Sequence, residues 1–139
     1  MEVVKKNINT KLRHIVAFLI IGILIAGVSV TIYARWQNVT SLSVGLSFNN
    51  DKGSLSGSVI GYSGTTRITA TAVLDRLNSN GTYTQMYSWN NLSSNNNYLI
   101  FNQTYYVARG YTYRLTFTPT VYKDGVGETV TDSKSAYAN

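Results

Sequence analysis

Apolar and polar residues alternate with a period of two through most of the chain after residue 40, and this pattern restricts the fold more than any other feature. Between residues 42 and 48, and again between 111 and 118, every second residue is aliphatic or aromatic. Successive side chains of a strand point to opposite sides, so a strand can bury such a set on one face, whereas a helix would scatter it. The pattern predicts an all-β fold built from antiparallel strands.

Seven segments of this kind are separated by turn residues, which suits a sandwich of two antiparallel sheets. The strands are expected at residues 42–48, 55–61, 67–75, 83–89, 98–101, 111–118 and 129–133. Asn80-Gly81 is the strongest hairpin signal, and we expect a primed turn there. The polar segment 90–97 is expected to be a loop. Pro119 is expected to end the sixth strand, because proline cannot donate to a sheet ladder.

A spacing near the sixth strand resembles the tyrosine-corner region of fibronectin type III domains. Val107 and Gly110 precede Tyr113, and Leu115 and Phe117 follow it. In that family the tyrosine hydroxyl bonds back to the chain just upstream. The resemblance implies a seven-stranded immunoglobulin-like, fibronectin type III-like sandwich in which Val107, Gly110 and Tyr113 have structural roles. Arg109 stands where that family usually has proline.

A wider set of segments is similar to small secreted or cell-surface proteins of Gram-positive anaerobic bacteria that carry one such domain and have no assigned function. The segments are residues 61–66, Trp89, residues 110–114 and residues 124–129. Their motifs are structural, so this resemblance implies a fold and a compartment rather than an activity.

An uncharged apolar segment at residues 15–33 precedes the strands, and Lys5, Lys6, Lys11 and Arg13 flank it. About 20 apolar residues in a helix span a bilayer core, and a basic flank stays in the cytoplasm. We therefore expect an N-terminal hydrophobic helix in residues 1–35 and an exported β-domain in residues 36–139. The segment fits either a transmembrane anchor or a signal peptide cleaved near Ala34.

The formal net charge of +6 is mainly a property of this leader. Residues 1–35 contribute +4 (five basic groups and one acidic), and residues 36–139 contribute +2 (seven basic and five acidic). A surface that binds phosphates clusters its basic groups, whereas those of residues 36–139 are spread along the chain. We therefore expect no nucleic-acid partner.

The inventory of reactive side chains is poor. The chain has no cysteine, and its single histidine, His14, lies in the basic flank. Disulfides, thiolate zinc sites and Ser-His-Asp catalysis are thereby excluded for residues 36–139. Asp51 and Asp124 fall in expected turns, and Glu128 and Asp132 on an expected solvated edge strand. We predict no catalytic residue, no metal site and no cofactor.

The remaining candidates for function are aromatic. Tyr83, Tyr87, Trp89 and Tyr98 lie in or after the central hairpin, with Tyr105 and Tyr106 further on. Tyrosine offers a large amphipathic contact area with few rotatable bonds, so a shared exposed face would bind a glycan or a protein. The other interpretation makes Trp89 a core residue between the sheets and the tyrosines cross-strand pairs. We predict a non-enzymatic binding module; the alternative is a structural spacer or a self-assembling surface subunit.

Overall fold

The structure, a computed structural model, describes residues 35–139, and the predicted leader helix lies outside them. The described part is all-β with eight strands, one more than predicted. They are β1 (Val39–Asn49), β2 (Lys52–Gly61), β3 (Thr65–Leu77), β4 (Tyr83–Ser94), β5 (Tyr98–Tyr106), β6 (Tyr111–Lys123), β7 (Val126–Thr129) and β8 (Asp132–Ala138). Within residues 35–139, no helix is long and apolar enough to cross a bilayer.

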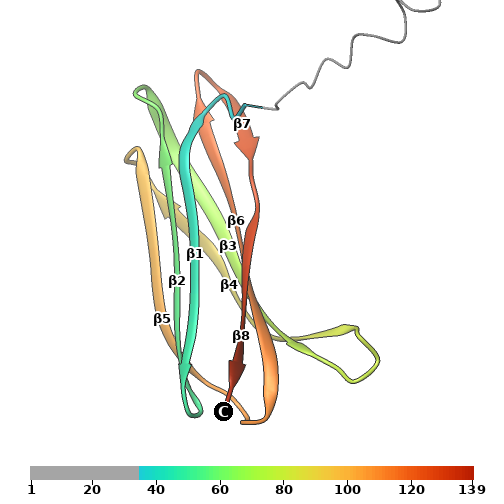
Figure 1. The fold of residues 1–139 in the computed structure, drawn as a ribbon. Coiled ribbons are helices and arrows are strands. Elements are labelled where there is room, and N and C mark those ends of the chain that lie inside the picture. Colours follow the sequence, from blue (N-terminus) through green and yellow to red (C-terminus); the bar gives the residue numbers. More distant parts are fainter. Residues whose placement is uncertain (1–34) are drawn as a thin grey trace, which may run out of the picture. The chain divides into compact units, whose positions relative to one another are not determined.

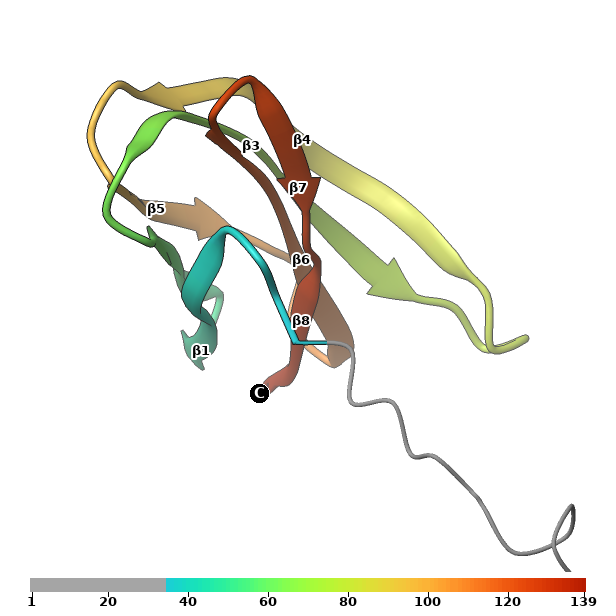
Figure 2. The ribbon, with the colours of Figure 1, turned by 90° about the horizontal axis from the view of Figure 1, so that it is seen from above.

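The strands form two antiparallel sheets that pack face to face (Figures 1 and 2). The three-stranded sheet has the order β1-β2-β5, and the five-stranded sheet has the order β4-β3-β6-β7, with β8 also paired to β6. Strands β2 and β5 are neighbours although β3 and β4 lie between them in the sequence, so the chain crosses from one sheet to the other and back. This arrangement places β4 and β5, joined by a short turn, as the edge strands on one side of the sandwich.

The core lies between the two sheets, on the faces that the alternation predicts. In β3 the alternating apolar residues Ile68, Ala70, Ala72 and Leu74 are all buried. Gly57 on β2 lets Phe117 of β6 approach the backbone closely. An added Cβ at Gly57 would lie 2.8 Å from the Phe117 Cγ, so this position accepts no larger side chain without movement of the ring.

The two-residue primed turn lies between β6 and β7, and not at Asn80-Gly81 where it was predicted. In the loop after β3, only Gly81 has a positive φ, and its N–H donates to the Asn78 carbonyl at 3.0 Å, so Asn80-Gly81 does not form the expected primed turn. Asp124 and Gly125 both have positive φ, 51° and 79°, and they alone separate β6 from β7. That pair has the geometry a two-residue primed turn requires.

Three strand boundaries also differ from the expectation. Residues 90–94, expected in a loop, continue β4, because the backbone of residues 92–94 pairs with β3 regardless of side-chain polarity. Likewise β5 extends beyond residue 101 to Tyr106 along β2. The strand expected at 129–133 is instead the end of β7, a break at Val130 and Thr131, and the start of β8.

Pro119 lies inside β6 rather than at its end, and the break between β7 and β8 explains why it is tolerated. The Pro119 carbonyl accepts a bond from the Val130 N–H at 3.0 Å, so the backbone of Pro119 faces the break. The N–H and C=O groups of one strand residue point to the same side, so the missing donor faces the break and not β3. The ladder between β6 and β3 therefore stays complete.

Candidate functional site

The structure does not bring the four predicted binding residues onto one surface. Tyr87 and Trp89 lie together at the β4–β5 side of the sandwich, with ring centroids 4.8 Å apart. Tyr98 is on the outer face of the three-stranded sheet, opposite Ile60 in the neighbouring strand. Tyr83 is on the outer face of the five-stranded sheet, where the Arg114 guanidinium lies 3.6 Å from its ring centroid.

A β-bulge separates Tyr83 from Tyr87. Both residues have odd numbers, so an uninterrupted strand would place them on the same face. However, Leu74 pairs with Tyr87 and Asp75 pairs with Gln85, which leaves Met86 as an extra residue in β4. One extra residue reverses the side to which the following side chains point. Tyr87 is consequently directed toward the other sheet and Tyr83 away from it.

Four aromatic rings close the sandwich where β4 and β5 run side by side; we call them the edge cluster and define it as Tyr87, Trp89, Phe101 and Tyr105. Trp89 contacts Phe101 and Tyr105 of the opposite sheet, with centroid distances of 5.3 and 5.8 Å. Tyr87 lies 5.4 Å from Tyr105. Trp89 thus packs between the sheets, as one of the two interpretations of the sequence held.

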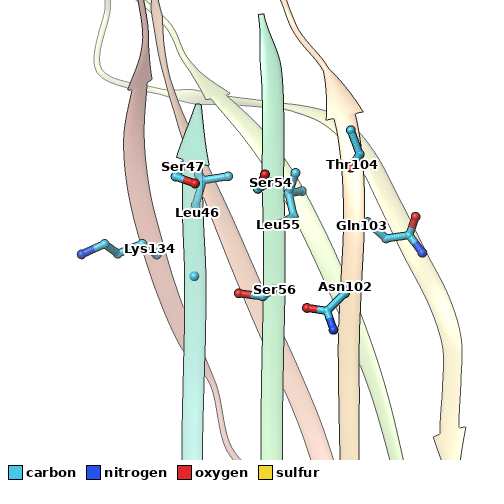
Figure 3. A pocket seen from close by; sticks show the side chains of 10 residues that line it. Leu46, Ser47, Ser54, Leu55, Ser56, Asn102, Gln103, Thr104 and Lys134 are labelled. Carbon is cyan, nitrogen blue, oxygen red and sulfur yellow. The ribbon is translucent and has the colours of Figure 1, made fainter. Parts of the chain in front are cut away.

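The edge cluster is partly open to solvent. Tyr87 is 47% exposed, and Trp89 and Tyr105 are half-buried, whereas Phe101 is buried. Strands β4 and β5 carry no charged residue along their whole length. Gln103 lies between Phe101 and Tyr105 in sequence and extends away from β2 in Figure 3. The edge cluster therefore offers aromatic rings with neighbouring amide and hydroxyl groups and no fixed charge.

Phe101 and Gln103 are the members of this region that sequence analysis missed. The alternation of Leu99, Phe101 and Tyr105 continues through Gln103, and it could have indicated a longer strand. The polar glutamine interrupts the pattern at the third position, so the strand was expected to end at residue 101.

The outer face of the three-stranded sheet is polar around Ser54, Ser56 and Asn102 (Figure 3). A shallow depression of about 790 Å³ lies over it. Its side chains include Ser47, Ser54, Ser56, Asn102, Thr104 and Lys134. A second depression of about 530 Å³, over the five-stranded sheet, includes Thr69, Thr71, Ser93, Thr118 and Thr120. Both surfaces present hydroxyl and amide groups, which can hydrogen-bond to a partner.

Two carboxylates, Asp75 and Glu128, have local structural partners. Asp75 forms an ion pair with Arg114 at 3.1 Å. Glu128 accepts hydrogen bonds from the backbone N–H groups of Gln37, Asn38 and Val39, at 2.9, 2.6 and 3.2 Å, instead of lying on a solvated edge as expected. Residues 35–139 contain no group of three or more acidic or histidine side chains placed to hold a metal ion.

The predicted structural residues lie at one end of the sandwich. The Tyr113 side chain is buried, and its hydroxyl donates to the Ala108 carbonyl at 2.8 Å. Gly110 has φ 84°, and its N–H donates to the Ala138 carbonyl at 2.7 Å. The Val107 N–H donates to the Asp51 carbonyl at 2.9 Å, in the turn between β1 and β2. These bonds tie the loop before β6 to the ends of other strands.

Comparisons with known proteins identify no family. No family model matches the chain, and no curated protein matches it. The fold is similar to that of Spo0M, a sporulation control protein from Bacillus subtilis, at 11% identity and a TM-score of 0.46, covering 75% of this chain and 51% of that one. It is also similar to part of a Parabacteroides merdae β-glucuronidase, at 11% identity and a TM-score of 0.39, covering 71% and 13%. The chain therefore spans about half the length of the first protein, and the likeness concerns the all-β fold alone.

Proposed function

We propose that residues 36–139 form an exported, non-enzymatic module of fibronectin type III-like architecture that binds a neutral glycan through the edge cluster. The observation that carries the proposal is the partly exposed set of rings at Tyr87, Trp89 and Tyr105, on two strands without charge. A sugar ring presents apolar C–H faces and hydroxyl edges, so it suits amphipathic aromatic side chains beside amide groups. A charged partner would gain no ion pair from β4 or β5.

The fold assignment within this proposal is supported by the corner at Tyr113. Tyr113 lies near the start of the sixth strand, and its hydroxyl donates to a carbonyl five residues upstream. A tyrosine near the start of strand F makes this bond in immunoglobulin-like sandwiches. Export is supported by the apolar segment 15–33 and its basic flank, which lie outside the described residues.

A second candidate function is the assembly of copies through sheet edges. It is favoured by a specific observation: the edge strand β5 carries no charged residue, although natural edge strands are commonly protected by charges.

The experiment for glycan binding compares Tyr87→Ala with Tyr137→Ala on an array of neutral bacterial and plant polysaccharides. Tyr137 is 56% exposed but lies on β8, so it is a matched control. We expect Tyr87→Ala to weaken binding about tenfold, because one stacked ring is lost, and Tyr87→Phe to retain most of it. Tyr137→Ala should bind like the unchanged protein.

Because Tyr87 also contacts Trp89, its removal could weaken the fold. The thermal unfolding midpoint of each variant is therefore measured, and only variants with an unchanged midpoint are compared for binding. The proposal fails if the folded, unchanged protein binds no neutral polysaccharide, or if Tyr87→Ala and Tyr137→Ala bind alike.

A further inference from the structure

Most edges of the two sheets are protected against pairing with another strand. Strand β4 contains two β-bulges, one of them next to Asn91 with φ 60°, and bulges blunt an edge. Strand β7 has only four residues, and β8 carries Asp132 and Lys134. Strand β8 contacts β1, and Lys134 of β8 lies beside β1 in Figure 3.

Strand β5 lacks all these protections. It has nine residues without charge or proline, and its register with β2 is uninterrupted. The Asn97 carbonyl bonds to the Gly61 N–H, and the Val107 N–H bonds to the Asp51 carbonyl, so the backbone groups of odd-numbered residues face β2 and its turn. Those of the even-numbered residues 98 to 106 therefore point away from β2, where a further strand could pair with them.

Three exposed large apolar residues lie along the same strand, and a fourth lies beside it on β2. On its outer face Tyr98 is 50% exposed, Ile100 63% and Tyr106 65%. Ile60, next to Tyr98 on β2, is 44% exposed. Large apolar side chains at such exposures next to an open strand edge are typical of an association surface.

We propose that β5 pairs antiparallel with β5 of a second copy of this chain, which joins two three-stranded sheets into one sheet of six strands. A two-fold axis at Asn102 places Asn102 opposite its own copy, Ile100 opposite Thr104, and Tyr98 opposite Tyr106. Residues opposite each other in this register all have even numbers, so their N–H and C=O groups face one another and bond. The pairing rests on the second candidate function, assembly through sheet edges, and gives it a strand and a register; it does not depend on glycan binding.

Charge favours a second copy over a charged partner strand. A two-fold axis brings identical segments together, so charges near it would repel. Lys52 is the only charged residue of β1, β2 and β5, and it lies opposite Tyr106 at the far end of the strand pair from Tyr98. In the six-stranded sheet the two Lys52 side chains would stand at opposite corners.

The absence of cysteine makes the register testable in the full-length chain. Hydrogen-bonded antiparallel partners have Cα atoms about 5.5 Å apart, which suits a disulfide. We expect Asn102→Cys to give a disulfide-linked dimer under mild oxidation in membranes or detergent. Ile100→Cys and Ser43→Cys should link much more slowly, because Ile100 lies opposite Thr104 and Ser43 lies on β1. Ser43 is exposed like Asn102, so it is the matched control.

A second variant tests the association without a cross-link. Asn102→Lys places two ammonium groups together at the axis, and we expect it to raise the dimer dissociation constant about tenfold or more in sedimentation equilibrium. Ser43→Lys should leave it unchanged, and both variants should keep the thermal midpoint because both sites are exposed. The proposal is overturned if Asn102→Cys links no faster than Ser43→Cys, or if Asn102→Lys dimerises like the unchanged chain.

Discussion

At the scale of single residues, Tyr113 combines a buried ring with one hydrogen bond from its hydroxyl to the Ala108 carbonyl. Burial raises the pKa of Tyr113 above its ordinary value of 10.0, and the nearby Arg76 guanidinium offsets part of this rise. Folding thus favours the neutral phenol. The contribution of Tyr113 to stability is fully present below about pH 10 and is lost as the pH rises through the raised pKa.

Tyr113→Phe should therefore change both the size of the unfolding free energy and its pH dependence. At neutral pH we expect a loss of about 0.5–1.5 kcal/mol, the net value of one hydrogen bond. Above pH 10 the unchanged protein should lose stability faster than the variant, so the difference between them should shrink. Urea unfolding at pH 8 and pH 11 measures the difference in unfolding free energy between the two proteins. An equal difference at both pH values would contradict the proposed role of the Tyr113 hydroxyl.

At the scale of elements, Glu128 joins the start of β1 to β7. Its carboxylate accepts three backbone N–H groups at residues 37 to 39. The Asn38 side chain adds bonds to the carbonyls of Val121 and Val126, at 3.2 and 3.1 Å. The first residues of the sandwich are thus fixed to the five-stranded sheet, although β1 belongs to the other sheet.

Glu128→Ala should weaken this junction. We expect the unfolding free energy to fall by roughly 1–3 kcal/mol, because hydrogen bonds to a charged group are stronger than neutral ones. Amide hydrogen exchange at residues 37–39 should accelerate. Asp132→Ala is the matched control, since within residues 35–139 the Asp132 carboxylate bonds to the adjacent Ser133 N–H alone, at 2.8 Å. Equal effects from the two variants would refute a special role for Glu128.

The same scale shows what side-chain patterning can and cannot predict. Alternation predicted the buried face of β3, because burial selects the side chains there. It did not predict residues 90–94 as strand, because an edge strand is held by backbone bonds to β3 that leave polar side chains free. The position of Pro119 depends on a break between β7 and β8, which is a property of the neighbouring strands.

For the candidate site, a β-bulge in β4 is the reason why the sequence did not predict which aromatic residues share a face. The sequence placed Tyr87 and Trp89 in one expected strand, and their rings do lie together. The extra residue at Met86 moved Tyr83 to the opposite face, and no residue in β4 signals where the register shifts. Tyr98 was grouped with the others by sequence proximity, yet the chain crosses to the other sheet before it.

At the scale of the whole molecule, we expect β8 to lie outside the cell and the basic flank of the leader to lie inside it. The cysteine-free chain allows a direct test with single cysteines and a membrane-impermeant maleimide. Ser135 is exposed on β8, and Asn7 lies in the basic flank. Because positive residues stay cytoplasmic, we expect Ser135→Cys to react in intact cells and Asn7→Cys only after permeabilisation.

The same samples separate the two possible fates of the leader. If the leader is an anchor, Asn7→Cys remains on the full-length chain and the intact mass corresponds to 139 residues. If it is cleaved near Ala34, the mature protein lacks residue 7, never reacts at that position and has a correspondingly lower mass. Reaction of Ser135→Cys only after permeabilisation would contradict export, and it would also remove the surface polysaccharides from the set of possible ligands for the edge cluster.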